Sequence, residues 1–300
     1  MSPTYLKVKA KLYWYYATLL GKVPFRDKFG LRYYLWRNTR LRGGVIGGVR
    51  TDDTGVLVQL FAILDSLVER RAKSEIVCFD VGAFIGVITL AMVSRLEDQG
   101  KVYAFEPSSV TYSRLLDNIR LNQANTVSPQ NVALLDSVGD AVLKLNAEEP
   151  GQSLIVDQDA IGDGRKTGDA GAYENVHTTT IYDFAKKNHI DAIDILKIDA
   201  EHSDHKVIAG ASPLLEKGAI SYIVHEVSRE ADNGYDYGRR SVSILESHGY
   251  ENFYIVRNGD FLVREIGNYP GEEYRPPLNM LAISPNAPVF RGGEGLDIRG

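Results

Sequence analysis

The chain has 300 residues, 44% of them hydrophobic, and a formal net charge of −5. This length allows one sizeable core and a smaller appendage, and the acidic balance argues against a nucleic-acid-binding specialist. The single cysteine, Cys78, excludes an intramolecular disulfide and a cysteine-based zinc cluster, and we expect it to pack in the core. With no apolar run near the ~18 residues of a membrane span and no signal-peptide core, we expect a cytoplasmic protein.

Residues 1–54 form a basic and aromatic extension. Between Lys7 and Arg42, ten Lys and Arg residues stand against one acid, Asp27. The favoured interpretation is a subdomain whose aromatic residues pack on the main body while its charges stay solvated. The alternative is a segment that contacts an anionic membrane surface or holds an acidic substrate. The sequence leaves open whether the protein is a monomer or a homodimer.

An amphipathic helix follows, which Asp52, Asp53 or Thr54 can cap. Its apolar face comprises Val56, Leu60, Ile63, Leu64 and Leu67. We expect this helix to cover a sheet just before the first central strand begins.

Residues 76–107 predict a strand, a glycine turn, a helix and a second strand. The first strand covers residues 76–79, which are apolar and suit burial on both faces, and it ends at Asp80. Gly82 and Gly86 bracket the turn. The second strand ends at Glu106, with Pro107 behind it.

This unit predicts a nucleoside site. Glycines let a ligand lie directly on the main chain, and a carboxylate such as Glu106 can accept hydrogen bonds from ribose hydroxyls. The turn lacks the G-x-G-x-x-G pattern of dinucleotide sites, which disfavours a nicotinamide oxidoreductase. A ligand with ribose but no phosphate fits better, and S-adenosylmethionine is the common one. An ordinary glycine turn is the alternative, but Asp80, both glycines and Glu106 together favour the site.

The middle of the chain predicts mixed elements. Ser108 or Ser109 can cap a helix, and residues 131–135 predict a strand in which Asn131 and Ala133 are assigned to the adenine half of the pocket. Residues 141–146 and 153–158 predict a hairpin. The glycine-rich residues 161–172 that follow are typical of a lid or a substrate loop, and a short helix ends near His189.

A second cluster of polar residues follows the strand predicted at residues 195–198. Asp199 ends this strand, and Glu201, His202, Asp204 and His205 come directly after it. Open α/β sheets bind ligands beyond the carboxyl ends of their strands, so we expect this cluster to face the same crevice as Gly82 and Glu106. The plainer interpretation is that Asp204 caps the next helix, which we expect, but this leaves Asp199 and Glu201 unexplained.

The C-terminal part predicts the closing elements of the sheet. Residues 220–224 predict a strand that leads into His225 and Glu226, and residues 236–248 a helix. Residues 251–256 and 279–284 predict an antiparallel pair. Residues 285–300 are polar and glycine-rich, and we expect a disordered tail.

With these blocks in view, the chain resembles the FkbM-type S-adenosylmethionine-dependent methyltransferases over about residues 55 to 284. The similar blocks occur in the family's order: DVGAFIG at 80–86, VYAFEPS at 102–108, NVALLD at 131–136, TTTIYDF at 178–184 and LKIDAEH at 196–202. The segment GLRYYLWR at 30–37 is similar to the family's N-terminal extension. Two residues depart from the pattern, because Phe84 stands where the family usually has Asn and His202 where it has Gly.

The resemblance implies an α/β fold, namely a class I methyltransferase (Rossmann-like) doubly wound sheet that is mostly parallel with an antiparallel closing strand, plus the small N-terminal extension. It implies a methyltransferase domain at 55–284 that binds S-adenosylmethionine and yields S-adenosylhomocysteine. The cofactor-binding residues that we expect are Asp80, Gly82, Ala83, Phe84, Gly86, Glu106, Pro107, Asn131, Ala133 and Asp199.

The implied reaction is O-methylation, most often of a sugar hydroxyl in a glycan, glycolipid or natural product. An alcohol is a weak nucleophile at neutral pH, so a base should assist the transfer. Asp199 and Glu201 are the first candidates, since they match the family's acids, and His202 follows because an unperturbed imidazole titrates near neutrality. His205 and His225 complete the candidates.

Two alternatives remain at this stage. The same acids could hold Mg²⁺ or Mn²⁺, which we do not favour because Asp199, Glu201 and Asp204 offer few oxygen ligands, so no metal-binding residue is assigned. The chain could also be a non-catalytic binding module in which Phe84 and His202 have eroded the site.

Overall fold

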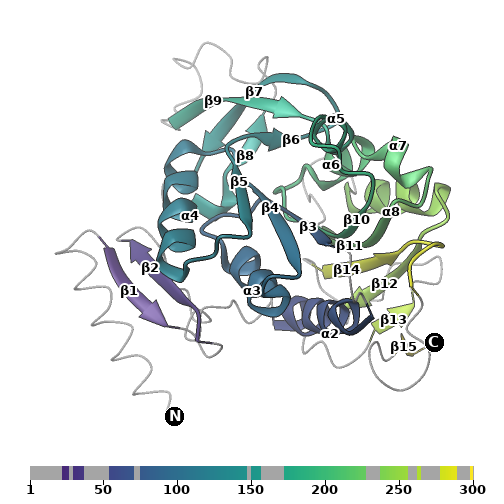
Figure 1. Ribbon diagram of the computed structural model, residues 1–300. Helices are drawn as coiled ribbons and strands as arrows, with labels where there is room; N and C mark the ends of the chain where they lie inside the picture. Colours follow the sequence, from purple (N-terminus) through teal and green to yellow (C-terminus); the bar gives the residue numbers. More distant parts are fainter. Residues whose placement is uncertain are drawn as a thin grey trace.

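The computed structural model describes residues 22–26, 30–36, 54–70, 75–146, 150–156, 172–227, 237–255, 262–264, 278–288 and 298–299. Its elements build one large sheet between two layers of helices, a second smaller sheet and an N-terminal hairpin (Figure 1). The predicted caps Asp52 and Asp53 and residues 161–171 of the predicted loop lie outside the described residues.

The large sheet has nine strands in the order β15-β13-β12-β14-β11-β10-β3-β4-β5. Its strands are β3 (Ile76–Val81), β4 (Gly100–Phe105), β5 (Val127–Gln130), β10 (Ile193–Ile198), β11 (Ile220–Val227), β12 (Glu251–Ile255), β13 (Leu262–Arg264), β14 (Leu278–Ile283) and β15 (Ile298–Arg299). The five strands from β5 to β11 are parallel, and β14 runs antiparallel to both β11 and β12. The predicted doubly wound sheet with an antiparallel closing strand is confirmed.

The chain reverses direction across the sheet between β3 and β10. From β3 the chain proceeds outward to β4 and β5, and it later returns to add β10 and β11 on the other side. In open α/β sheets such a switch point opens a crevice at the carboxyl ends of the strands. Asp80 lies in β3 and Asp199 follows β10, so the fold brings the two predicted clusters to this point.

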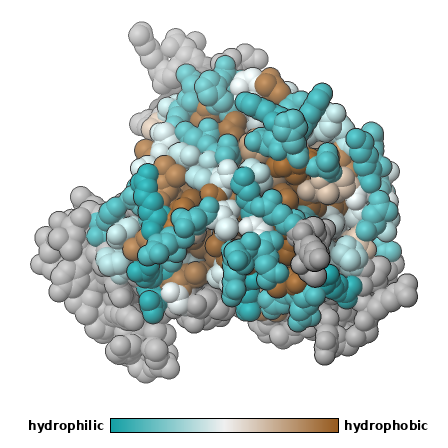
Figure 2. Space-filling model, in the orientation of Figure 1, coloured by the Kyte–Doolittle hydropathy of each residue, from teal (hydrophilic) through white to brown (hydrophobic). Residues whose placement is uncertain are grey.

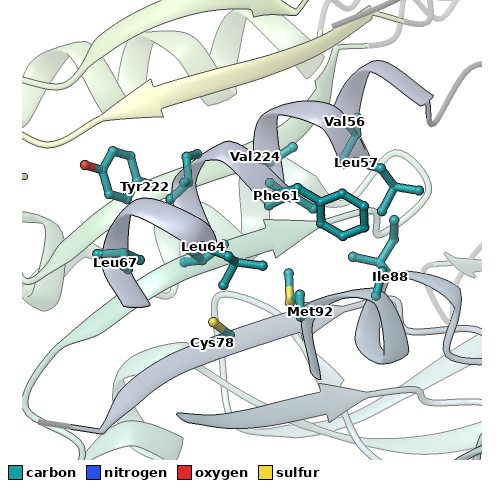
Figure 3. Packing of buried hydrophobic residues seen from close by; sticks show 14 of the residues in the cluster. Val56, Leu57, Phe61, Leu64, Leu67, Cys78, Ile88, Met92, Tyr222 and Val224 are labelled. Atoms are coloured by element: carbon teal, nitrogen blue, oxygen red, sulfur yellow. The ribbon is translucent and has the colours of Figure 1, made fainter. Parts of the chain in front are cut away.

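One face of the large sheet is covered by α2 (Thr54–Arg70) and α3 (Val87–Leu96), with α4 (Ser109–Asn122) beside them. Figure 3 shows side chains of α2 pointing at the sheet and at Ile88 and Met92 of α3. All five residues of the predicted apolar face of α2 are at most 3% exposed, and Cys78 is fully buried beneath them. The predicted packing of this helix face on the sheet and the predicted burial of Cys78 in the core are both confirmed.

The opposite face is covered by α5 (Ile181–Lys187), α6 (Asp204–Ala209), α7 (Ser212–Leu215) and α8 (Tyr237–Ser247). Phe184 of α5 packs edge-on against Phe79, Tyr103 and Phe105 of β3 and β4, with ring centroids 4.8 to 5.7 Å apart. Edge-to-face packing of this kind stabilises the core beyond the area that it buries.

A second sheet has four strands in the order β6-β9-β7-β8. They are β6 (Ala133–Leu134), β7 (Gly139–Leu145), β8 (Leu154–Val156) and β9 (Ala172–Thr179), and the 3-10 turn Pro150–Gln152 lies between β7 and β8. The predicted hairpin is confirmed as β7 and β8. The predicted strand at 131–135 is wrong in its extent, because the chain leaves the large sheet after β5 and enters the second sheet at β6. The sequence analysis did not predict β5, because Pro129 lies within it. Proline is tolerated there because β5 is an edge strand.

The N-terminal hairpin consists of β1 (Lys22–Arg26) and β2 (Arg32–Trp36) and lies against α4 (Figure 1). Tyr33 is 2% exposed and packs with Leu90 and Ala124. In the described residues, the hairpin therefore packs on the main body, as the favoured interpretation of the sequence expects.

The tail from Pro285 is structured where it is described, contrary to the expectation of disorder. Ala287 is buried in the core, the Tyr222 hydroxyl donates to the Pro288 carbonyl at 2.7 Å, and β15 pairs with β13. No helix within the described ranges has the length and apolar character needed to cross a membrane.

Candidate active site

The glycine turn joins the ends of three strands. The backbone N–H groups of Gly82 and Ala83 both donate to the Phe105 carbonyl at the end of β4. Gly82 has φ +73°, and a Cβ there would lie 1.9 Å from the Asp199 carbonyl oxygen. A side chain at this position would therefore collide with the backbone that follows β10, so glycine is required.

A buried ion network lies below this turn. Asp80 is fully buried, and its carboxylate accepts from the Thr89 hydroxyl at 2.5 Å. Lys197 Nζ lies 3.8 Å from Asp80 Oδ1 and 3.2 Å from Asp199 Oδ2. Burial raises the pKa of Asp80, and the charge of Lys197 opposes this rise. Lys197 therefore holds two carboxylates together at the switch point of the sheet.

Lys197 is a site residue that sequence reasoning missed. It is 7% exposed, within a strand whose six residues are all buried. A charged residue in such a strand requires a partner, since burying an unpaired charge is costly. A lysine within a predicted buried strand was therefore a visible signal in the sequence. The sequence did not show that Asp80 is its partner.

Glu106 is 7% exposed and accepts two backbone hydrogen bonds, from Phe84 N and from Ser108 N, both at 3.0 Å. These bonds tie the glycine turn to the start of α4. Burial raises the pKa of Glu106 to about 8. A carboxyl group with this pKa is largely protonated at neutral pH, so beside these two bonds Glu106 has one O–H donor and remaining acceptor positions for ribose hydroxyls.

Asn131 lies next to this acid, with its Nδ2 donating to the carbonyls of Glu106 and Pro107 at 2.9 Å each. Two other predicted cofactor residues bury their side chains elsewhere. Ala83 packs with Ala104 and Leu115 under α4. Ala133 packs with Leu143 and Val176 in the second sheet, so only the backbone of either alanine is available to a ligand.

Both departures from the family motifs fall on left-handed backbone. Phe84 has φ +51° and His202 has φ +70°, and Glu201 beside it has φ +37°. Asn and Gly, which the resembling family has at these two positions, adopt this region readily, whereas Phe there is strained. The chain keeps the backbone geometry although it lacks the residues that favour it.

The Phe84 ring lies under the turn of the β7–β8 hairpin. A Cβ at Gly151 would lie 3.6 Å from the ring atoms Cε2 and Cζ of Phe84. The second sheet therefore reaches the glycine turn through Gly151. This contact was not predicted, because nothing in the local pattern relates the two positions.

Asp199, Asp204 and Glu226 gather around Lys197 at the ends of β10 and β11. Asp204 Oδ1 accepts from Ala200 N at 2.8 Å and its Oδ2 from Glu226 N at 3.0 Å, so Asp204 links the two strand ends. The expectation that Asp204 caps α6 is wrong, because its carboxylate bonds backbone outside that helix. Burial raises the pKa of Asp204 to about 6.

Glu226 is the second site residue that the sequence analysis missed. Burial raises its pKa to about 8, with further contributions from Asp199, Asp204 and Glu201. In the sequence it stands two residues beyond the run at 220–224 that predicts a buried strand, and this was the available signal. Like the other acids, it belongs to the edge where ligands bind in this fold.

The three candidate histidines differ in exposure. His225 is fully buried, and burial lowers its pKa to about 4, so it is neutral. His205 on α6 is 8% exposed, and burial lowers its pKa as well. His202 is partly exposed directly after Glu201. Of the three, His202 is therefore the imidazole best able to meet an acceptor.

No group of three or more His, Cys, Asp and Glu residues in the described part of the chain has an arrangement that could hold a metal ion. Two of the acids at the ends of β10 and β11 have protein partners, since Asp199 accepts from Lys197 and Asp204 accepts from two backbone N–H groups.

Comparisons with known proteins give concordant results. The model of the methyltransferase FkbM domain matches residues 80–251, which is more than half of the chain. The methyltransferase sdnD of Sordaria araneosa is 31% identical over an alignment of 152 residues, which covers 44% of this chain. The match spans 58% of that relative's length.

Similar solved structures include a methyltransferase FkbM from Methylobacillus flagellatus KT, with a TM-score of 0.43 and 13% identity over 74% of this chain and 47% of that chain. Another is the fibrillarin of Aeropyrum pernix in complex with natively bound S-adenosyl-L-methionine, with a TM-score of 0.40 and 14% identity over 88% of this chain and 94% of that chain.

Proposed function

Because the chain belongs to the FkbM methyltransferase family, we propose that it transfers the methyl group of S-adenosylmethionine to a hydroxyl of a sugar, in a glycan, a glycolipid or a glycosylated natural product. One observation carries this proposal. Gly82 of the turn lies directly against the backbone of Asp199, so a cofactor on the turn and the acids after β10 share one edge of the sheet.

The residues of the turn fit this cofactor. The missing Cβ atoms of Gly82 and Gly86 make room for the Asp199 carbonyl and the Leu115 side chain. Gly82 and Phe84 are partly exposed, so a ligand can reach the backbone of the turn there. Glu106 would accept the ribose hydroxyls, and Asn131 stands beside it on the adenine side. When bound, the cofactor supplies an electrophilic methyl group and leaves as S-adenosylhomocysteine.

The acids at the ends of β10 and β11 would serve the acceptor. As the acceptor oxygen forms its bond to the methyl carbon, the carbon–sulfur bond breaks and the hydroxyl proton passes to a base. Asp199 and Glu201 are our first candidates for this base, and His202 is the next. Lys197 is bonded to Asp199 at 3.2 Å and would hold that carboxylate in place.

The charge of the site supports a neutral acceptor. Asp199, Glu201, Asp204 and Glu226 act electrostatically on one another, with Lys197 as their cation. Asp204, with a pKa of about 6, is ionised at neutral pH and disfavours an anionic acceptor, whereas Glu226, with a pKa of about 8, is largely protonated and can donate to a sugar hydroxyl. We therefore favour a neutral sugar over a sugar phosphate.

The test is methyl transfer with labelled S-adenosylmethionine and a panel of neutral deoxysugar glycans, read by mass spectrometry as a gain of one methyl group. Asp199→Ala should lose at least about 100-fold in kcat, the contribution typical of a general base, with less effect on cofactor binding than the loss of Glu106. Glu106→Ala should weaken cofactor binding instead. Full activity of Asp199→Ala would place the reaction elsewhere.

Two further measurements separate the alternatives. Loss of activity in EDTA that Mg²⁺ restores would favour a metal-dependent transferase. Calorimetry that shows no binding heat at millimolar S-adenosylmethionine would favour a non-catalytic module. The strained Phe84 and His202 would then be the residues that have eroded the site.

A further inference from the structure

Two asparagine side chains of α4 form hydrogen bonds with the backbone of β2 in the N-terminal hairpin. Asn122 Oδ1 accepts from Arg32 N at 2.9 Å, and its Nδ2 donates to the Arg32 carbonyl at 2.6 Å. One helical turn earlier, Asn118 Oδ1 accepts from Tyr34 N at 2.7 Å. Residues at i and i+4 share a helix face, so the pair presents two amides to β2. The hairpin is therefore docked by specific hydrogen bonds.

Asn118 makes one contact that Asn122 does not. Its Nδ2 donates to the carbonyl of Ile85, within the glycine turn, at 2.8 Å, and the residue is fully buried. The second donation of Asn122 goes to the Asn118 carbonyl of the same helix instead. Asn118 thus joins the N-terminal hairpin to the turn through a single side chain.

Packing connects the same parts. Tyr33 of β2 packs with Leu90 of α3, the helix that begins directly after Gly86. On the other side of the turn, a Cβ at Gly86 would lie 2.7 Å from Leu115 Cδ1 of α4. The turn therefore contacts α4 and leads into α3, and the hairpin packs on both of these helices.

We infer that Asn118 is a positioning residue, which couples the docking of the N-terminal hairpin to the shape of the glycine turn and so sets the affinity for the cofactor. The inference rests on the proposed function only in that S-adenosylmethionine is the ligand of the turn. The physical reason is that the Ile85 carbonyl and the Tyr34 N–H share one buried partner. Removing that partner frees both at once.

The experiment compares Asn118→Leu with Asn122→Leu in the full chain. Leucine is close to asparagine in shape and removes the hydrogen bonds. We expect faster amide hydrogen exchange in β2 for both variants, and faster exchange at residues 82–86 by about tenfold in Asn118→Leu alone. We expect KM for S-adenosylmethionine to rise about tenfold in Asn118→Leu, with kcat at saturation unchanged, and less than about twofold in Asn122→Leu.

Equal exchange at residues 82–86 in the two variants would overturn the inference, as would a loss confined to kcat. Tyr34→Pro is a second variant, which removes the N–H given to Asn118 while the asparagine stays in place. It should also speed exchange in the turn, and unchanged exchange there would count against the coupling. If the unaltered protein binds no S-adenosylmethionine, the proposed function fails, whereas the exchange comparison still tests the coupling.

Discussion

At the scale of single residues, the site depends on backbone conformations that side chains rarely adopt. Gly82 and Gly86 adopt them freely, while Phe84, Glu201 and His202 adopt them with a side chain present. Strain of this kind persists only where surrounding contacts determine the backbone. Here those contacts are the bonds from Gly82 and Ala83 to β4 and from Phe84 to Glu106.

Replacing Gly82 by alanine should destabilise the protein by more than about 3 kcal/mol, because φ strain adds to a collision with the Asp199 carbonyl. Gly30→Ala is the matched control, since Gly30 has φ +89° but no atom within 4 Å of the added Cβ. It should cost about 1 kcal/mol, from φ strain alone. Urea unfolding measures both, and equal losses would show that the contact with Asp199 does not matter.

At the scale of elements, the carboxyl ends of the central strands are fastened to one another by side chains. Glu106 fastens the glycine turn to the start of α4, and Asp204 fastens the end of β10 to that of β11. In both cases one carboxylate accepts hydrogen bonds from two backbone N–H groups. Fixed loops of this kind are what a reaction between two aligned substrates requires.

Asp204→Ala should lower the free energy of unfolding by about 2 to 3 kcal/mol, because it leaves the N–H groups of Ala200 and Glu226 without their acceptor. Asp183→Ala is a suitable comparison. Asp183 is exposed and accepts from the Thr180 hydroxyl at the start of α5, and its loss should cost about 1 kcal/mol. Chemical denaturation distinguishes the two, and a similar small loss in both variants would contradict the role given to Asp204.

At the scale of the whole molecule, two layers of helices enclose an apolar sheet. The buried acids Asp80, Glu106 and Asp204 lie at the carboxyl ends of its strands, and Asp194 is buried near the start of β10. The face shown in Figure 2 has hydrophobic residues interspersed among hydrophilic ones. The large exposed hydrophobic side chains in the described ranges, Val58, Val110, Val138 and Tyr173, come from different elements. Stability is therefore sensitive to pH through the interior of the site.

We expect the stability of the protein to fall as pH rises from about 5 to 9. Glu106 and Glu226 have their pKa raised to about 8, so the folded state binds more protons than the unfolded state between the ordinary glutamate pKa and 8. Stability decreases with pH wherever the folded state binds more protons. His225, with its pKa lowered to about 4, acts in the opposite sense only below its ordinary pKa of 6.5.

Urea unfolding of Glu226→Gln at a series of pH values tests this. The variant should lose less stability than the unaltered protein between pH 6 and 9. Glu216→Gln, at an exposed position, should leave the slope unchanged. Parallel slopes for all three proteins would exclude Glu226 as a source of the effect.

The sequence by itself determined the fold class, the glycine turn, the acid after the second strand and the strand edge at which the acids gather. These features follow from local patterns. Apolar runs and helical periodicity predict the strands and helices, and the order of the blocks along the chain predicts a shared strand edge. Gly82, Glu106 and Asp199 were found in this way.

Only the tertiary structure decided which groups act on each other. The pairing of Lys197 with Asp80, the link from Asp204 to Glu226, and the contact of Phe84 with Gly151 each join parts far apart in the chain. The division of residues 127–134 between two sheets depends likewise on partners that the local pattern does not contain. Burial, and with it the state of each acid and histidine, is set by what the rest of the chain places around it.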